Sequence, residues 1–212
     1  MTTALIDFDS GNLHSAQKAF ERMAAETDAG EIVVTADPEV VRGADRLVLP
    51  GDGAFPACRA ALLAHEGLAE ALTDAVMRDG RPLLGICVGM QMLATTGHEY
   101  EQTPGFGWIP GAIRRIAPAD PGLKVPHMGW NDLVLDRPHP VLDGLASGDH
   151  AYFVHSYQME VDDPAHRLAH ADYGAEITAI VARDTVIGTQ FHPEKSQATG
   201  LRLIANFLRW TP

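Results

Sequence analysis

The sequence predicts an α/β fold: an open, mostly parallel sheet flanked by helices, with an added antiparallel β section. In the first half of the chain, short apolar runs alternate with segments of helical periodicity, a pattern typical of parallel strands connected by helices. In the second half, short strand-like runs follow one another between turns, which favours antiparallel pairing. The 212 residues contain no repeat and no linker, so we expect a single domain spanning residues 1–212.

Each element rests on a local pattern. Residues 3–8 form a short apolar run, and residues 12–26 place apolar side chains at helical spacing after capping residues at 10–12. The other elements of the first half are strands at 31–35, 46–49 and 82–87, a helix at 67–77 and a helical run from residue 88 through residue 93. The second half is expected to hold strands at 112–116, 129–135, 151–154, 167–171, 177–182 and 186–191, and a last helix at 197–210.

The charge balance excludes two classes of partner. Lys and Arg number 16 against 28 Asp and Glu, a net charge of −12. Nucleic acids and acidic membrane surfaces both require a cationic face. The first residues carry neither a basic region nor a long apolar stretch, so we expect no signal peptide and a cytoplasmic protein with reduced thiols.

The two cysteines differ in context. Gly85-Ile86-Cys87-Val88-Gly89 has the G-x-C-x-G form of a nucleophile elbow, in which a sharp turn from strand to helix presents the central side chain. The turn would place the thiol at a helix N-terminus, where a thiolate is stabilised. A small buried core residue is the competing interpretation of Cys87, and the pentapeptide alone leaves both open. Cys58 has no flanking glycines and is expected to be passive.

A cysteine nucleophile needs a base that a third group orients. Among ten histidines, only His192 combines the end of a strand with a nearby carboxylate, that of Glu194. Pro193 between them favours extended backbone at His192, which would put both side chains on one face. A solvated turn is the competing interpretation, and the elbow on another strand favours the catalytic one.

An oxyanion hole is expected beside the elbow. The Val88 N–H would supply one donor, and the loop after strand 46–49 would supply a second from Asp52 or Gly53. The carboxylate of Asp52 would oppose an oxyanion unless it points away.

No cofactor or metal is expected. His166 and His170 lie four residues apart in a strand-like segment and lack a third ligand. No Walker-type loop is present, and Gly105-Phe106-Gly107 lacks the third glycine of a dinucleotide fingerprint.

These motifs resemble the class I (triad) glutamine amidotransferases and, among them, the glutaminase subunits of imidazole glycerol phosphate synthases. The elbow and the string His192-Pro193-Glu194 mark the superfamily, whereas Met90 and the strings at 126–131 and 152–157 mark the histidine-pathway branch. The matching segments span nearly the whole chain in the expected order: 6–13, 49–55, 85–91, 126–131, 152–157 and 188–196.

The resemblance implies that Cys87 attacks the side-chain amide of glutamine, with His192 moving protons and Glu194 orienting it. Gln91 would contact the polar end of glutamine. Ser156 and Tyr157 would form the opposite wall of the pocket.

The resemblance also implies a partner, a separate (β/α)8-barrel cyclase that receives the ammonia and makes imidazole glycerol phosphate and a carboxamide intermediate of purine synthesis. Pro126, Met128 and Trp130 would face this cyclase. Ordinary core packing is the competing interpretation of Met128 and Trp130. In this family Asp52 replaces a residue that is more often apolar, and Val88 replaces leucine.

Three other functions stay open from the sequence. The chain could be a glutaminase that feeds another acceptor, against which Met90 and the string at 126–131 argue. It could be a non-catalytic regulatory protein, against which intact Cys87, His192 and Glu194 argue. It could also be a cysteine hydrolase of another kind with a similar fold.

Overall fold

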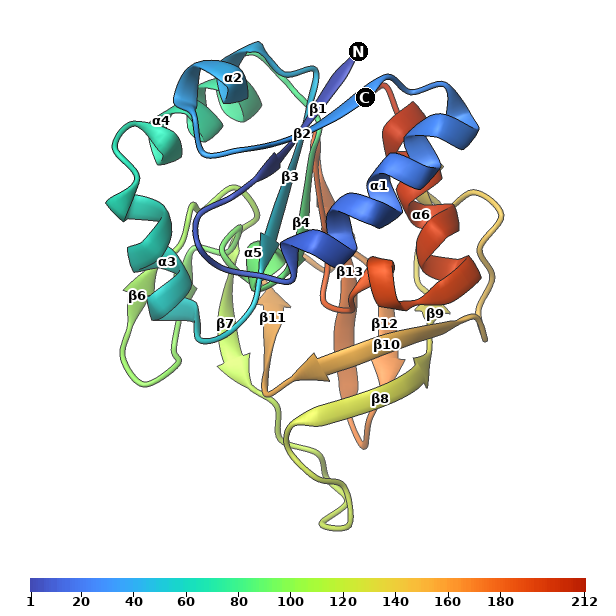
Figure 1. Cartoon of the computed structure of the whole chain (residues 1–212). Coiled ribbons are helices and arrows are strands. Elements are labelled where there is room, and N and C mark those ends of the chain that lie inside the picture. Colours follow the sequence, from blue (N-terminus) through green and yellow to red (C-terminus); the bar gives the residue numbers. More distant parts are fainter.

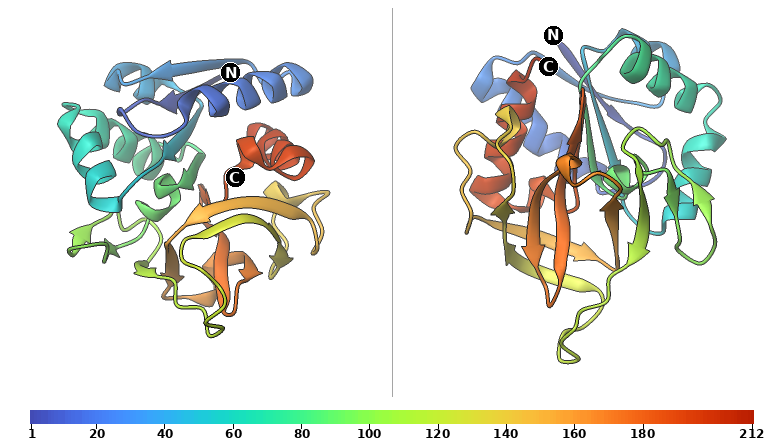
Figure 2. Two further views of the ribbon diagram at one scale, coloured as in Figure 1. Left: turned by 60° about the horizontal axis from the view of Figure 1, so that its bottom comes forward. Right: turned by 180° about the vertical axis from the view of Figure 1, so that it is seen from behind.

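The computed structural model describes all residues from Met1 to Pro212. Its main sheet has eight strands in the order β2-β1-β3-β4-β14-β13-β12-β9 (Figure 1). The strands from β2 to β14 pair in parallel, and β13, β12 and β9 continue the sheet by antiparallel pairing. The helices α1 and α6 pack together on one side of the sheet, and α2, α3 and α4 lie on the other (Figures 1 and 2). The predicted fold class is therefore confirmed.

The main sheet comprises β1 Thr2–Ile6, β2 Glu31–Thr35, β3 Arg46–Gly51, β4 Leu83–Cys87, β9 Val134–Leu135, β12 Arg167–Asp172, β13 Glu176–Arg183 and β14 Val186–Thr189. The helices are α1 Leu13–Thr27, α2 Pro38–Gly43, α3 Phe55–Ala64, α4 Leu68–Thr73, α5 Val88–Gln91 and α6 Gln197–Arg209. None of them has the length and apolar character needed to cross a membrane.

Two smaller sheets complete the antiparallel section. One pairs β8 (His127–Asp132) with β10 (His150–His155), and this ribbon lies across the lower end of the molecule in Figure 1. The other has the order β11-β7-β5-β6 and comprises β5 Thr96–Gly97, β6 Thr103–Pro104, β7 Gly111–Arg115 and β11 Tyr157–Val161.

Several predicted elements differ in extent. The helix predicted at 67–77 divides into α4 and a π-helical turn over Asp74–Arg78. The helical run predicted through residue 93 ends at Gln91, and the strand predicted at 129–135 is two strands, β8 and β9. The elements α2, α3, β5, β6 and β11 were not predicted from the sequence.

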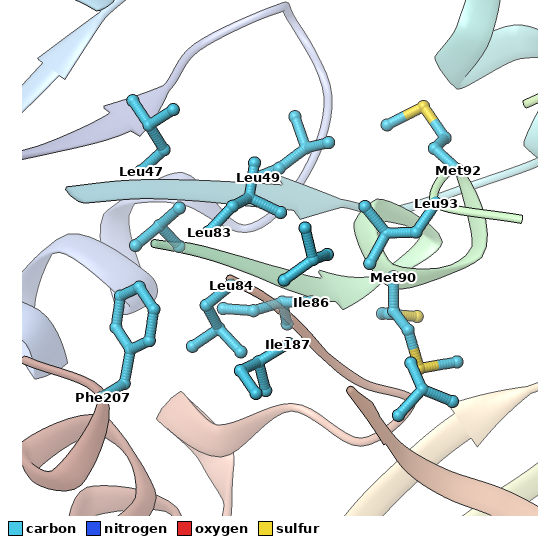
Figure 3. Packing of buried hydrophobic residues seen from close by; sticks show 14 of the residues in the cluster. Leu47, Leu49, Leu83, Leu84, Ile86, Met90, Met92, Leu93, Ile187 and Phe207 are labelled. Carbon is cyan, nitrogen blue, oxygen red and sulfur yellow. The ribbon is translucent and has the colours of Figure 1, made fainter. Parts of the chain in front are cut away.

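The hydrophobic core surrounds the central strands. All residues of β3 and β4 are buried, as expected for parallel strands covered on both faces. Figure 3 shows Leu49, Leu83 and Ile86 of these strands packed with Ile187 of β14 and neighbouring apolar side chains. The packing fixes β3, β4 and β14 side by side, so the loops that follow them open at one edge of the sheet.

Candidate active site

Cys87 ends β4 in the strained backbone of an elbow, with φ 55° and ψ −112°. A Cβ added at Gly85 would lie 2.8 Å from the carbonyl carbon of Gly89, and one added at Gly89 would overlap the carbonyl oxygen of Leu49. The elbow closes on its own backbone at Gly85 and packs against that of β3 at Gly89, so glycine is required at both positions. The structure therefore supplies the physical reason for the G-x-C-x-G spacing, and Cys87 is only 4% exposed.

His192 and Glu194 form a buried pair. His192 Nδ1 lies 2.9 Å from Glu194 Oε1, and the two side chains are 3% and 2% exposed. Beyond His192 the chain enters a 3-10 turn, Pro193–Lys195, rather than staying extended, so the turn and not a shared strand face brings the two groups together. The backbone of His192 is held by a hydrogen bond from its N–H to the carbonyl of Tyr152 at 3.0 Å.

The electrostatics of this pair favour a protonated imidazole. Burial lowers the pKa of His192, but hydrogen bonding and charge at Cys87 and Glu194 outweigh burial and raise the pKa to about 10. The Nε2 atom is buried and no hydrogen bond to it meets the usual geometric limits, whereas Nδ1 is bonded to Glu194. Sulfur, imidazole and carboxylate thus form a coupled group suited to an ion pair of thiolate and imidazolium.

The helix after the elbow stabilises a thiolate less than its predicted length implies. α5 has only four residues, so its dipole is small. The N–H of Val88 is nevertheless a first-turn donor without an acceptor in its own helix, and it adjoins the sulfur.

A cavity of about 190 Å³ adjoins Cys87. It brings together all the predicted oxyanion and substrate residues: Asp52, Gly53, Val88, Gln91, Ser156 and Tyr157. Pro126, Val154, His155 and Glu99 complete its wall. A larger hollow of about 390 Å³ beneath residues 135–145 contains no pair of nucleophile and base.

Three residues near Cys87 were not predicted as site residues from the sequence: Glu99, His155 and the buried Gln190. One carboxylate oxygen of Glu99 accepts a hydrogen bond from the N–H of Phe55 at 2.7 Å. Gln190 Nε2 lies 3.7 Å from Cys87 Sγ. His155 lies within the string at 152–157 and Gln190 within the segment 188–196, but neither stands in a pattern that assigns chemistry, because their contacts depend on the tertiary fold.

The loop after β3 is held by Ser10 and Cys58. The carbonyl of Asp52 accepts from Ser10 Oγ at 2.8 Å and from Cys58 Sγ at 3.3 Å, and the N–H of Asp52 donates to Ser10 Oγ at 3.4 Å. Asp52 is exposed, so solvent screens the charge of its carboxylate from an oxyanion. Burial raises the pKa of the Cys58 thiol, which keeps it protonated as a donor. Cys58 therefore does more than pack.

The predicted partner residues lie on β8 and just before it. Met128 is 62% and Trp130 47% exposed, and Pro126 is exposed as well. The core-packing interpretation of Met128 and Trp130 is therefore wrong. His127, directly before Met128, is buried, so this strand has one face toward the protein and one open to solvent.

Comparison with known proteins identifies the family. Residues 4–210 match the family described as Glutamine amidotransferase class-I. Among solved structures, one described as a glutamine amidotransferase superposes with a TM-score of 0.73 at 21% identity, covering 97% of each chain. A glutamine amidotransferase from Thermotoga maritima superposes with a TM-score of 0.64 at 16% identity, covering 96% of this chain and 80% of that one. The chain belongs to the class I glutamine amidotransferases.

Curated relatives narrow this class. The imidazole glycerol phosphate synthase subunit HisH of Cereibacter sphaeroides is 70% identical, and that of Ruegeria pomeroyi 66%, each over the full length of both chains. The same subunit of Rhodospirillum rubrum is 58% identical over the full length of both chains. Within its class, the chain belongs to the HisH family.

Proposed function

We propose that this chain is the glutaminase subunit of an imidazole glycerol phosphate synthase in histidine biosynthesis and that it hydrolyses glutamine to glutamate and ammonia through a thioester on Cys87. One observation carries this proposal. The elbow of Cys87 and the buried pair of His192 and Glu194 meet at one edge of the sheet, beside a cavity, in a chain that is 70% identical to a HisH subunit.

In the first half-reaction, the Cys87 thiolate attacks the side-chain amide carbon of glutamine, and the carbonyl electrons move onto oxygen. When the tetrahedral intermediate collapses, the C–N bond breaks and the imidazolium of His192 gives its proton to the departing nitrogen. Ammonia leaves and the glutamyl group stays on sulfur. The raised pKa of His192 supports this role, since the ring enters the reaction carrying the proton.

In the second half-reaction, neutral His192 takes a proton from water, and the resulting hydroxide equivalent attacks the thioester. The C–S bond breaks, glutamate leaves, and Cys87 returns as a thiolate beside protonated His192. Glu194 holds the imidazole in one tautomer through both steps, since its carboxylate accepts from Nδ1 at 2.9 Å.

The oxyanion of both intermediates would be met by the N–H of Val88 and by one donor from the loop after β3. In the structure the N–H of Asp52 donates to Ser10, whereas the N–H of Gly53 makes no hydrogen bond within the protein. Asp52 could therefore serve only after its peptide turns away from Ser10. Gly53 has a φ of 104°, and the conformational freedom of glycine allows the neighbouring Asp52 peptide to rotate.

Substrate binding is constrained by which atoms are already paired. Gln91 Nε2 donates to the carbonyl of Tyr157 and to Gln190 Oε1, both at 3.1 Å, so Gln91 has only its oxygen to offer glutamine. That oxygen suits the α-ammonium group. Glu99 adds a carboxylate to the same cavity. Ser156 remains a candidate wall residue opposite Gln91.

Ammonia would pass to a separate (β/α)8-barrel cyclase that docks on Pro126, Met128 and Trp130. A closed passage is favoured because ammonia in neutral water is largely protonated and ammonium is not a nucleophile. We propose that both partner proteins are cytoplasmic and that residues 1–212 form one catalytic domain. The two unpaired cysteines suit a reducing compartment.

Glutamate release from glutamine, measured with and without a co-expressed cyclase, tests this function. Cys87→Ala should abolish glutamine-dependent synthesis, while added ammonia still supports the cyclase reaction. Cys58→Ser, which keeps a donor for the Asp52 carbonyl, is the matched control and should retain turnover. Glutamine turnover by Cys87→Ala would refute the assignment of Cys87 as the nucleophile. Loss of the ammonia-dependent reaction would refute the assignment of the synthesis step to the cyclase alone.

A further inference from the structure

Gln190 lies between β14 and His192 and is fully buried. Its side-chain Nε2 is 3.7 Å from the sulfur of Cys87, within the range of N–H···S hydrogen bonds. We propose that Gln190 is a further catalytic residue, whose amide N–H donates to the Cys87 thiolate and stabilises it. This inference rests on the proposed role of Cys87 as nucleophile.

The orientation of the Gln190 amide follows from one atom, the carbonyl oxygen of Tyr157. A carbonyl can only accept, so Gln91 must present its NH₂ group to it at 3.1 Å. The second N–H of the same group then meets Gln190 at 3.1 Å, which requires the oxygen of Gln190 at that place. With its oxygen turned to Gln91, Gln190 has its NH₂ group on the side of Cys87. The hydrogen-bond pattern thus forces a donor, and not an acceptor, against the sulfur.

A second hydrogen-bond chain, from Asn131 through His127 and His155, reaches the same Tyr157 carbonyl from the other side. His155 Nδ1 lies 2.8 Å from the Tyr157 oxygen and must donate to it, which leaves His155 Nε2 as an acceptor. His127 Nδ1, at 3.0 Å, then donates to that nitrogen, and His127 Nε2 accepts from Asn131 Nδ2 at 3.2 Å. The tautomers of both histidine rings in this chain are therefore determined. With two donors on it, the Tyr157 oxygen has both lone pairs engaged and keeps its place.

The chemistry of a neutral donor at sulfur differs from that of His192. An amide cannot take up the proton, so Gln190 lowers the free energy of the thiolate without joining the proton transfers. The hydrogen bond weakens when the C–S bond forms and sulfur loses its charge. It forms again when the thioester is hydrolysed and sulfur leaves as a thiolate, so Gln190 assists the second half-reaction as the stabiliser of a leaving group.

Alkylation of Cys87 by iodoacetamide over a range of pH tests the proposal, with Cys58→Ser as the parent so that a single thiol reacts. Gln190→Met keeps the shape and removes the donor. Because hydrogen bonds to charged groups are worth more than neutral ones, the inflection of rate against pH should rise by about one pH unit. Gln190→Glu should raise it further, since it keeps an oxygen for Gln91 but places a second acceptor against the sulfur.

The matched control is Gln158→Met, the same change on β11, where Gln158 accepts from the N–H of Thr178 and does not touch Cys87. It should leave the inflection in place. An inflection unchanged in both Gln190 variants, with folding intact by circular dichroism, would overturn the proposal, and Gln190→Glu carries the test if Gln190→Met fails to fold. Because iodoacetamide needs no glutamine, a chain that alkylates as expected but releases no glutamate would refute the proposed function alone.

Discussion

His192 Nδ1 and Glu194 Oε1 lie 2.9 Å apart across a 3-10 turn that begins at Pro193, and both side chains are almost fully buried. A buried carboxylate has few partners to exchange, so the imidazole is held in one orientation. The proline starts the turn with the backbone angle that a helical turn needs. The position of the base relative to its carboxylate therefore depends only on neighbouring residues of this turn. Cys87, in contrast, lies on a strand far earlier in the chain.

Glu194→Gln should lower kcat for glutamine hydrolysis in the complex about 10²- to 10⁴-fold. The amide keeps the shape but loses the charge that helps to keep His192 protonated, and either of its ends can face the ring. The measurement is glutamate release at saturating glutamine. Glu160→Gln, an exposed change at a residue that pairs with Arg114 on the surface, is the control and should retain full activity. An unchanged kcat in Glu194→Gln would contradict the role of this pair.

Gly89→Ala should destabilise the fold by about 2 kcal/mol or more, because a Cβ would overlap the Leu49 carbonyl and the two strand ends would have to separate. Urea unfolding monitored by fluorescence gives the free energy. Gly43→Ala is the matched control, since nothing lies within 4 Å of the added carbon and the position is helical. That change should be neutral or stabilising. Equal stability of both variants would show that β3 and the elbow do not pack as closely as the structure has them.

The elbow could be predicted because part of its constraint is local: a Cβ at Gly85 would meet the backbone of Gly89 and Met90 in the same turn, whereas the need for glycine at position 89 comes from Leu49 of β3. His192 and Glu194 could be predicted as well, because they share one turn. Gln190 and Glu99 could not be predicted, because their contacts join residues far apart in sequence. Gln190, for instance, meets Cys87 from 103 residues away.

Element boundaries failed where local pattern and tertiary packing disagree. Helix α2 has six residues, too few for a periodic apolar stripe, and it is fixed by the Asp37 cap at its start and Pro38 in its first turn. The helical run after Cys87 stops at Gln91 because Met92, Ala94 and their neighbours bond to the loop that returns at residues 105–109. The sequence of residues 88–93 alone does not show these hydrogen-bond partners.

His127 and His155 should make the protein less stable in acid. Burial lowers the pKa of each ring to about 4, whereas an unfolded histidine titrates near its ordinary value of 6.5. Between these values the unfolded chain binds more protons than the native one, so stability is full above pH 6.5 and falls as pH drops toward 4. Urea unfolding at several pH values gives the slope.

Two-dimensional NMR of the ring nitrogens separates this cause from general acid effects. The signals of His127 and His155 should stay those of neutral rings, with the proton on Nδ1, at every pH above about 5. Protonation of either ring above about pH 5 would show that the hydrogen-bond chain from Asn131 to the Tyr157 carbonyl is not closed in solution.

Trp130→Ala should weaken binding of the cyclase by about 2 kcal/mol or more, a rise in Kd of about 30-fold, because large aromatic side chains dominate the binding energy of interfaces. Trp130 is half-exposed on β8, stacks edge-on against Tyr152 of β10, and lies beside Met128 on the open face of the ribbon. Calorimetry with purified cyclase gives the Kd. Tyr100→Ala, at an aromatic residue that is 86% exposed near β5, is the control, since it removes an aromatic side chain elsewhere on the surface and should leave the Kd unchanged. An equal Kd for Trp130→Ala and the parent would show that the cyclase binds another face of the protein. The exposure of Trp130 on the ribbon of β8 and β10 would then have another cause.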